Sequence, residues 1–280
     1  MSADTRYKAE LTGVSETALL TLHARAQEAR RPDAIIDDPM AISLVDSIDA
    51  DFAKFGSSRQ EIALRARAYD LTTKRYLSSH PDATVVALAE GLQTSFWRLD
   101  ASLHASRFHW LTVDLPRIIE LRRRLLPESP RVSLCAQSAL DYSWMDRVTA
   151  PQSDTDGVFI TAEGLLMYLQ PEQALGLIAE CAKRFPGGQM LFDLPPTWFT
   201  AISRFGLLRP SLRYKVPEMP FSRSIDDLAD LANTVPGIRA VRDLAMPPGR
   251  GLVFNTLLST AYQVSLLDRV RPTLTLLEFG

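Results

Sequence analysis

Residues 84–94 of the chain read Thr-Val-Val-Ala-Leu-Ala-Glu-Gly-Leu-Gln-Thr, a short apolar run that ends in a turn of small residues. A second apolar run, residues 109–113, is followed directly by Asp114. A strand, a turn at its carboxyl end and a carboxylate after the next strand are the parts of a nucleotide-binding half-fold, in which the carboxylate accepts hydrogen bonds from ribose hydroxyls. The segment therefore predicts a parallel sheet with a nucleoside site at its carboxyl edge.

The turn lacks the glycine pattern of dinucleotide-binding proteins. The pattern G-x-G-x-x-G would need glycines where this chain has Ala89 and Thr94. Those glycines let the backbone approach a pyrophosphate. The turn therefore favours a cofactor that contains a ribose but no phosphate, and it makes an NAD-dependent oxidoreductase the less favoured alternative.

The rest of the chain divides into four parts. Residues 15–80 show helical periodicity without a strand-like run, whereas strands and helices alternate from residue 83 onward. Residues 195–250 are rich in proline and aromatic residues and interrupt this alternation. We predict an α/β fold with a helical N-terminal cap (1–80), a cofactor-binding Rossmann-like core (81–194), a lid or substrate-side insertion (195–250) and closing strands of the core (251–280). The strands are expected at residues 84–89, 108–113, 131–136, 157–162, 189–193, 251–258 and 273–279.

Composition excludes several classes of function. The net charge is −2, with 31 basic and 33 acidic residues, which argues against a nucleic-acid partner. The basic run Arg122–Arg124 is expected to lie on a solvated helix face. The two cysteines match no metal-ligand spacing, so no metal is expected. No apolar run approaches the roughly 20 residues that span a bilayer, which predicts a cytoplasmic protein without a membrane partner. The oligomeric state stays open.

Four segments, in this order and spacing, carry a resemblance to a known family. They include Arg-Ala-Arg-Ala-Tyr-Asp at 65–70, residues 85–98, Thr-Val-Asp-Leu-Pro at 112–116 and Thr-Ala-Glu-Gly-Leu-Leu-Met-Tyr-Leu at 161–169. The set resembles the leucine carboxyl methyltransferase family of class I S-adenosylmethionine-dependent methyltransferases, and within it the bacterial branch of polyketide O-methyltransferases. The resemblance covers about residues 15–195. It implies a Rossmann-like, mostly parallel sheet with an antiparallel last strand.

The resemblance also implies a cofactor and a reaction. The cofactor would be S-adenosylmethionine, with S-adenosylhomocysteine as the product. The methyl acceptor would be a carboxylate, or a hydroxyl, of a small organic and polyketide-like acid. A noncatalytic relative that binds a metabolite or a partner stays open as an alternative.

Carried over position by position, the resemblance implies a cofactor site. Arg67 would hold the methionine carboxylate of the cofactor, Gly91 would lie beneath its methionine part, and Asp114 would bind the ribose. The full set of expected cofactor contacts is Arg67, Ala89, Glu90, Gly91, Asp114, Leu115, Ala139, Leu140 and Glu163. Three of them also have a structural interpretation: Arg67 as a surface arginine, Asp114 as a helix cap, and Glu163 as a solvated strand end.

Two positions depart from the family pattern. Ala89 stands where the family has the first glycine of its turn, and Ala139 stands where it has an aspartate beside the adenine, with Asp141 nearby as a substitute. A methyl group at position 89 is tolerated if the φ angle there is negative. A positive φ would strain the turn and weaken cofactor binding.

The acceptor site is less well defined by the sequence. Candidate acceptor contacts are Tyr168, Trp198, Phe199, Arg204 and Tyr214, with Arg213 as a further candidate cation. No metal, nucleophile-elbow or Cys/His pattern is present. A carboxylic acid with a pKa of about 4 is already ionised at neutral pH, so a carboxylate acceptor needs no general base. Catalytic residues are therefore left unassigned.

Overall fold

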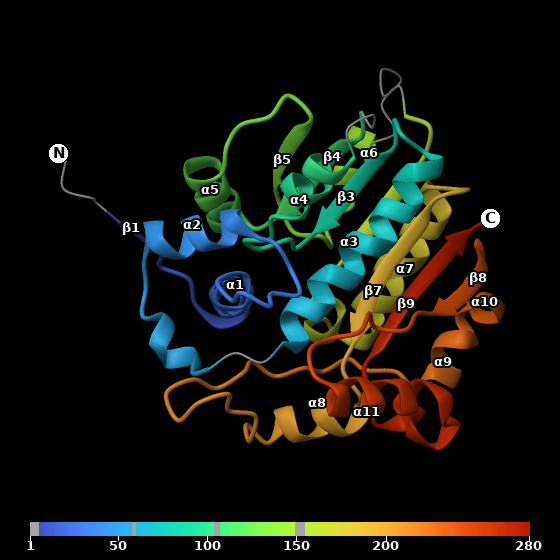
Figure 1. The fold of residues 1–280 in the computed structure, drawn as a ribbon. Coiled ribbons are helices and arrows are strands. Elements are labelled where there is room, and N and C mark those ends of the chain that lie inside the picture. The colour runs from blue at the N-terminus through green and yellow to red at the C-terminus, as the bar shows by residue number, and fades with distance from the viewer. Residues whose placement is uncertain (1–5, 58–59, 104–106, 149–154) are drawn as a thin grey trace.

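A seven-stranded sheet forms the centre of the protein (Figure 1). The computed structural model describes residues 6–57, 60–103, 107–148 and 155–280. The strand order is β5 (Val132–Ala136), β4 (His109–Asp114), β3 (Thr84–Leu88), β6 (Val158–Ala162), β7 (Gln189–Leu194), β9 (Thr273–Phe279) and β8 (Ile238–Asp243). Strands β3 to β7 are parallel, and β9 is antiparallel to both of its neighbours. The α/β class and the antiparallel last strand agree with the sequence prediction.

Helices cover both faces of the sheet because its strands are apolar on both sides. In β3, Val85 and Ala87 pack into one buried cluster, and Val86 and Leu88 pack into another on the opposite face. The first cluster is completed by α3 (Glu61–Ser79) and α4 (Ser95–Ser102), and the second by α6 (Trp144–Val148) and α7 (Pro171–Arg184). The strand order reverses between β3 and β6, which is where open α/β sheets bind ligands.

The N-terminal cap packs against the carboxyl ends of β3 and β4. It contains α1 (Thr17–Ala29), α2 (Pro39–Ser47) and the short helices η1 (Gly13–Glu16) and η2 (Phe52–Phe55). Leu19 and Leu22 of α1 pack with Leu92 after β3 and with Ile118 of α5 (Pro116–Leu125). The cap also holds a parallel pair of two-residue strands, β1 (Tyr7–Lys8) and β2 (Ile48–Asp49), which the helical pattern did not predict.

Two assignments near the C-terminus are corrected by the structure. Residues 251–258, expected as a strand, begin the helix α11 (Leu252–Gln263). A short apolar run does not distinguish a helix from a strand. The second closing strand is instead β8, within the segment assigned to the lid. Its charged residues Arg239, Arg242 and Asp243 are typical of an edge strand. They interrupt the apolar run by which a strand is predicted from the sequence.

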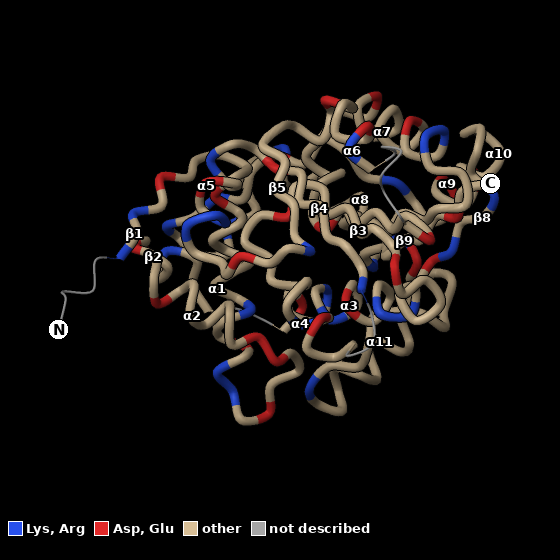
Figure 2. Tube along the Cα trace, turned by 90° about the horizontal axis from the view of Figure 1, so that it is seen from above, with Lys and Arg blue, Asp and Glu red and all other residues tan. Residues whose placement is uncertain are grey.

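The remaining elements are α8 (Thr197–Arg204), α9 (Ile225–Ala229), α10 (Leu231–Thr234), η3 (Leu166–Tyr168) and η4 (Ser265–Arg269). In Figure 1, α8, α9 and α11 are drawn below the sheet, and α10 is drawn beside the edge strand β8. Basic and acidic residues are mixed along the trace in Figure 2. Within the described residues, no helix combines the length and apolar character needed to cross a membrane.

Candidate functional site

A cavity of about 1020 Å³ lies at the carboxyl ends of β3, β4, β6 and β7. This volume is at the upper end of the roughly 300–1,000 Å³ typical of small-molecule sites. Its walls come from the N-terminal residues 14–21, α3, the strand ends and the segment between β7 and β9. None of the described lining residues is a histidine, lysine or cysteine. With a volume of about 1020 Å³, the cavity has room for more than one small ligand.

The turn after β3 has a left-handed backbone at two positions. Gly91 has a φ of 61°, and a Cβ atom built on it would come within 3.1 Å of the Ala18 Cβ atom. Ala89 has a φ of 49° and is the one non-glycine residue with a positive φ in the described parts of the chain. For an L-residue this conformation costs about 1–2 kcal/mol. The backbone at Ala89 is therefore strained, as expected for a positive φ at this position.

Replacing Ala89 with glycine should relieve this strain. We expect Ala89→Gly to raise the free energy of unfolding by about 0.5–1 kcal/mol, because the greater freedom of glycine in the unfolded chain offsets part of the gain. Urea denaturation measures this change. Ala87→Gly is the matched control: Ala87 is buried in β3 with ordinary geometry, so glycine there should destabilise the protein. A loss of stability in Ala89→Gly would contradict the assignment of strain.

Asp114 is fixed by the turn and faces the cavity. Its Oδ2 atom accepts a hydrogen bond from the backbone N–H of Gly91 at 2.7 Å, and its Oδ1 atom accepts one from Leu115 at 2.7 Å. Burial raises the pKa of Asp114 to about 6, although the two N–H donors act in the opposite direction. The carboxylate thus joins β4 to the β3 turn. Asp114, Leu115, Ala89 and Gly91 all line the cavity.

Glu90 lines the same cavity but is already paired. Its Oε2 atom lies 2.9 Å from Nη2 of Arg122 and accepts hydrogen bonds from Trp110 and Thr112. The side chain is only 3% exposed. Arg122, expected on a solvated face, is buried, whereas its neighbour Arg123 is exposed. The correction has a physical reason, because a guanidinium can be buried where a carboxylate and backbone carbonyls surround it.

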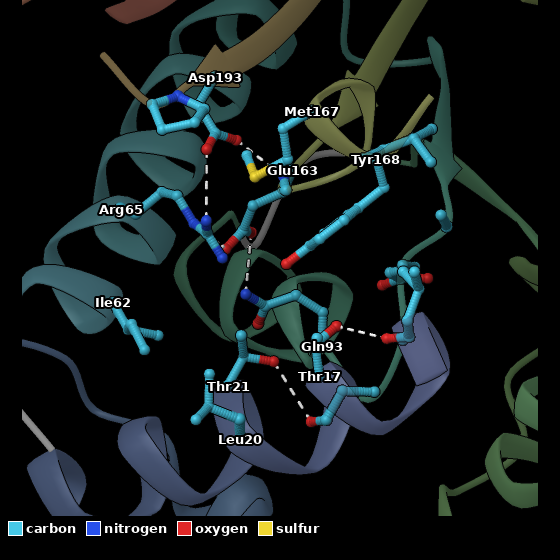
Figure 3. Close-up of a pocket in the computed structure, with 18 of the residues that line it drawn as sticks. Thr17, Leu20, Thr21, Ile62, Arg65, Gln93, Glu163, Met167, Tyr168 and Asp193 are labelled. Atoms are coloured by element: carbon cyan, nitrogen blue, oxygen red, sulfur yellow. Dashed lines mark hydrogen bonds and ion pairs between the residues drawn. The ribbon is translucent and has the colours of Figure 1, made fainter. Parts of the chain in front are cut away.

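A second group of charges lines the cavity, on α3, in the turn after β6 and on β7 (Figure 3). Arg65 donates to Oε1 of Glu163 at 3.0 Å and to Oδ2 of Asp193 at 3.3 Å. The other oxygen of Asp193 accepts from Tyr69 OH and from the Gly164 N–H, both at 2.8 Å. Burial raises the pKa of Glu163, and Arg65 opposes this effect. Arg65 is thus held between two carboxylates at the cavity wall.

The structure does not bring Arg67 to this cavity; the arginine of α3 that lines it is Arg65. Successive helical residues are about 100° apart, so residues 65 and 67 point to different sides of α3. No ion pair or hydrogen bond of the Arg67 side chain is found among the described residues. A helical stripe was the available signal for Arg65, because Ile62, Tyr69 and Thr73, all in the lining, lie three, four and eight residues from it.

A buried ion cluster lies behind the turn, between the cap and α4. Asp38 pairs with Arg25 and, at 2.7 Å, with Arg98, which also binds Asp70 at 2.7 Å. Burial favours a higher pKa for Asp38, but the two guanidinium groups lower it below its usual range. Gln93 connects this cluster to the cavity wall, because it accepts from Arg98 at 3.1 Å and donates to Glu163 at 2.9 Å.

The charges around Arg65 and the buried ion cluster around Asp38 together contain four carboxylates and three guanidinium groups. The carboxylates are Asp38, Asp70, Glu163 and Asp193, and the guanidinium groups are Arg25, Arg65 and Arg98. Sequence reasoning did not single out Asp193, although it comes at the end of a buried strand as Asp114 does. The excess negative charge suits a ligand that carries positive charge.

The other expected residues divide into two sets. Ala139, Leu140, Tyr168, Trp198 and Phe199 line the cavity. Four others do not: Arg204 donates to the Pro220 carbonyl, Tyr214 packs edge-on against Phe55, Arg213 pairs with Asp51, and Asp141 binds Ser143. The segment after β7 adds lining residues that the sequence did not indicate, most of them apolar: Arg209, Pro210, Val216, Met219, Met246, Phe254, Leu258, Val270 and Pro272.

Comparison with known proteins identifies the family. The model of the leucine carboxyl methyltransferase family matches residues 18–182. The chain belongs to this family. It is 32% identical over 232 residues to the tetracenomycin polyketide synthesis O-methyltransferase TcmP of Streptomyces glaucescens, covering 82% of each chain. It is also 27% identical over 251 residues to the S-adenosyl-L-methionine-dependent methyltransferase dpfgK of Gibberella zeae, covering 83% of this chain and 82% of that protein.

Solved structures show the same fold for this leucine carboxyl methyltransferase family member. The CurJ carbon methyltransferase superposes with a TM-score of 0.53 at 14% identity, over 95% of this chain and 68% of the other. A putative methyltransferase from Thermobifida fusca gives a TM-score of 0.50 at 15% identity, over 93% and 94% of the two chains. These likenesses concern the fold alone.

Proposed function

We propose that this protein is an S-adenosylmethionine-dependent O-methyltransferase that methylates a carboxylate of a small, largely apolar and polyketide-like acid. Membership of the leucine carboxyl methyltransferase family and the similarity to two methyltransferases, TcmP and dpfgK, support methyl transfer. The observation that carries the proposal is the chemical division of one cavity. Its lining has a polar part, which includes Asp114 of β4 and Arg65 of α3, and a mainly apolar part from the segment after β7, which includes Trp198 and Phe199.

The residues of the polar part fit the cofactor. Asp114 would bind the ribose hydroxyls, and Ala139 and Leu140 would pack on the adenine. Arg65 is suited to the amino-acid carboxylate, since its planar guanidinium binds carboxylates bidentately. The excess negative charge of the two ion clusters complements the sulfonium and ammonium groups. Gly164, with a φ of 63°, lets the backbone pass under Arg65, because a Cβ atom there would come within 3.3 Å of the guanidinium.

The chemistry requires positioning more than proton transfer. When bound, the cofactor supplies a methyl group activated by a positively charged sulfur. The side chains of the lid exclude water and orient the acceptor. A carboxylate acceptor is ionised at neutral pH without help. A phenol acceptor would need a base to remove its proton. Burial raises the pKa of the lining residue Tyr168 to about 12, so its hydroxyl stays protonated at neutral pH. No described lining residue is a histidine or a lysine, and this supports a carboxylate acceptor.

Calorimetric titration separates this proposal from its alternatives. We expect micromolar binding of S-adenosylhomocysteine and no binding of NAD. NAD binding without S-adenosylhomocysteine binding would favour an oxidoreductase. The absence of binding by either nucleoside would favour a noncatalytic relative.

The nature of the acceptor group can be tested with labelled cofactor. The protein is incubated with S-adenosylmethionine tritiated in its methyl group and with a panel of aromatic acids that carry both carboxyl and hydroxyl groups. A methyl ester releases volatile methanol in mild base, whereas an aryl methyl ether does not. Base-stable label would contradict the carboxylate assignment while leaving O-methylation in place.

The pKa of Asp114 predicts a pH dependence of cofactor binding. Because this pKa is about 6, S-adenosylhomocysteine affinity should be constant above pH 7 and should fall as the pH drops below about 6, where a proton occupies the carboxylate. The effect on stability has the opposite sign. The pKa in the folded state exceeds the unfolded value of about 3.9, so the contribution of Asp114 to stability is greatest below that value and is lost as the pH rises through 6.

Calorimetry between pH 5 and pH 8 measures this dependence, with Asp114→Asn as the control. The variant should bind more weakly at pH 7.5 and should lose the acid-side decline. An equal decline in Asp114→Asn and in the wild-type protein would assign the titration to another group.

A further inference from the structure

Three consecutive backbone carbonyls of the turn after β3 are bound by two buried arginines. Nη1 of Arg122 donates to the carbonyls of Gly91 and Gln93, both at 2.9 Å. Nη2 of Arg25 donates to the carbonyl of Leu92 at 2.6 Å. Arg122 comes from α5 and Arg25 from α1, and each is 1% exposed. Two helices distant in sequence thus hold one short segment from its carbonyl side.

The N–H groups of the same segment are also bound. Ala89 donates to the Val113 carbonyl at 2.8 Å, Gly91 donates to Asp114 at 2.7 Å, and Gln93 donates to the Glu90 carbonyl at 3.2 Å. These bonds tie residues 89–93 to β4 and to the turn itself. The turn therefore has few free polar groups through which it could relax into another conformation.

Each arginine has its own buried carboxylate. Arg122 pairs with Glu90, and Arg25 pairs with Asp38. The pairing allows both guanidinium groups to remain buried while their other N–H groups bind the turn. Glu90 itself belongs to the turn, so the Arg122 pair ties both its side chain and its backbone.

We propose that Arg122 and Arg25 are positioning residues that hold the turn 89–93 in the left-handed conformation that Ala89 disfavours. A glycine at position 89 would adopt this conformation without strain. In this chain the bound carbonyls supply the constraint instead. The consequence for cofactor binding rests on the function proposed above, whereas the consequence for the conformation of the turn does not.

A double-mutant cycle between positions 122 and 89 tests this. Arg122→Lys keeps the charge beside Glu90 but removes the planar fork that reaches two carbonyls and a carboxylate at once. We expect it to weaken S-adenosylhomocysteine binding about tenfold, equivalent to about 1.4 kcal/mol. Ala89→Gly should change the affinity less than twofold in the wild-type protein and restore it at least fivefold in Arg122→Lys. Arg123→Lys, on the exposed side of α5, is the matched control and should change neither affinity nor coupling.

Hydrogen exchange followed by mass spectrometry gives a readout without ligand. Exchange in the peptide that covers residues 88–95 should be faster in Arg122→Lys and should slow again in the double variant. If Ala89→Gly has the same effect in both backgrounds, in binding and in exchange, Arg122 acts only on general stability and the proposal is overturned. If the wild-type protein binds no S-adenosylhomocysteine, the proposed function fails, and exchange alone decides the positioning role.

If Arg122→Lys does not fold, a double replacement can be used in its place. Glu90→Gln combined with Arg122→Gln removes both charges of the pair, so no buried charge is left unpaired. The cycle with Ala89→Gly is then measured in this double variant. Restored affinity and slower exchange would support the proposal, and an equal effect of Ala89→Gly in both backgrounds would overturn it. Arg25→Lys provides the independent test at the Leu92 carbonyl.

Discussion

Replacing Arg65 with glutamine should weaken S-adenosylhomocysteine binding at least 30-fold, which corresponds to about 2 kcal/mol. The guanidinium at this position lies at the cavity wall and binds Glu163 and Asp193. Glutamine cannot offer the charged fork that binds a carboxylate bidentately, and it leaves two neighbouring carboxylates without their counter-ion. Calorimetric titration well below the unfolding temperature measures the change.

Arg67→Gln is the matched control on the same helix. Arg67 is outside the cavity lining, so its replacement should change the affinity less than twofold. This pair of variants also decides between the arginine that the family resemblance indicated and the one that the structure brings to the cavity. A large loss in Arg67→Gln with little change in Arg65→Gln would return the role to Arg67.

Replacing Asp38 with alanine should lower the free energy of unfolding by about 3–5 kcal/mol, the usual cost of leaving a buried charge without its partner. Asp38 is fully buried and pairs with Arg25 and Arg98. It also accepts from the Ala41 N–H at the start of α2, so the variant loses a helix cap as well. Urea denaturation measures the loss.

Asp46→Ala is the control for this prediction. Asp46 pairs with Arg30 on the surface with its side chain 62% exposed, and such pairs contribute about 0–1 kcal/mol. The pKa of Asp38 is lowered in the folded state, so its contribution is present above its unfolded pKa and is lost as the pH falls. A loss below about 1 kcal/mol in Asp38→Ala would show that the cluster is not a main source of stability.

Local patterns were sufficient for the core of the fold. The apolar runs of β3, β4 and β6 are buried on both faces, and proline marks the starts of α5 and α7. These signals come from residues close together in sequence. The same kind of signal failed at α11, where a short apolar run fits both a helix and a strand.

The cavity shows a similar division. Asp114 and Gly91 could be selected from one strand and one turn, because both requirements are local. The choice between Arg65 and Arg67 depends on which side of α3 meets β6 and β7. The burial of Arg122 depends on Glu90 and on carbonyls about 30 residues away, and no local pattern contains that information.

The sequence by itself determined the order of strands and helices from β3 to β7, the turn after β3 and the carboxylate at the end of β4, because backbone preferences and hydrophobic periodicity act over a few residues. Only the tertiary structure decided which charges are buried, which arginine of α3 faces the cavity and which residues after β7 line it. Those outcomes depend on groups that meet across long sequence separations, where burial changes the energy of a charge far more than its neighbours in the chain do.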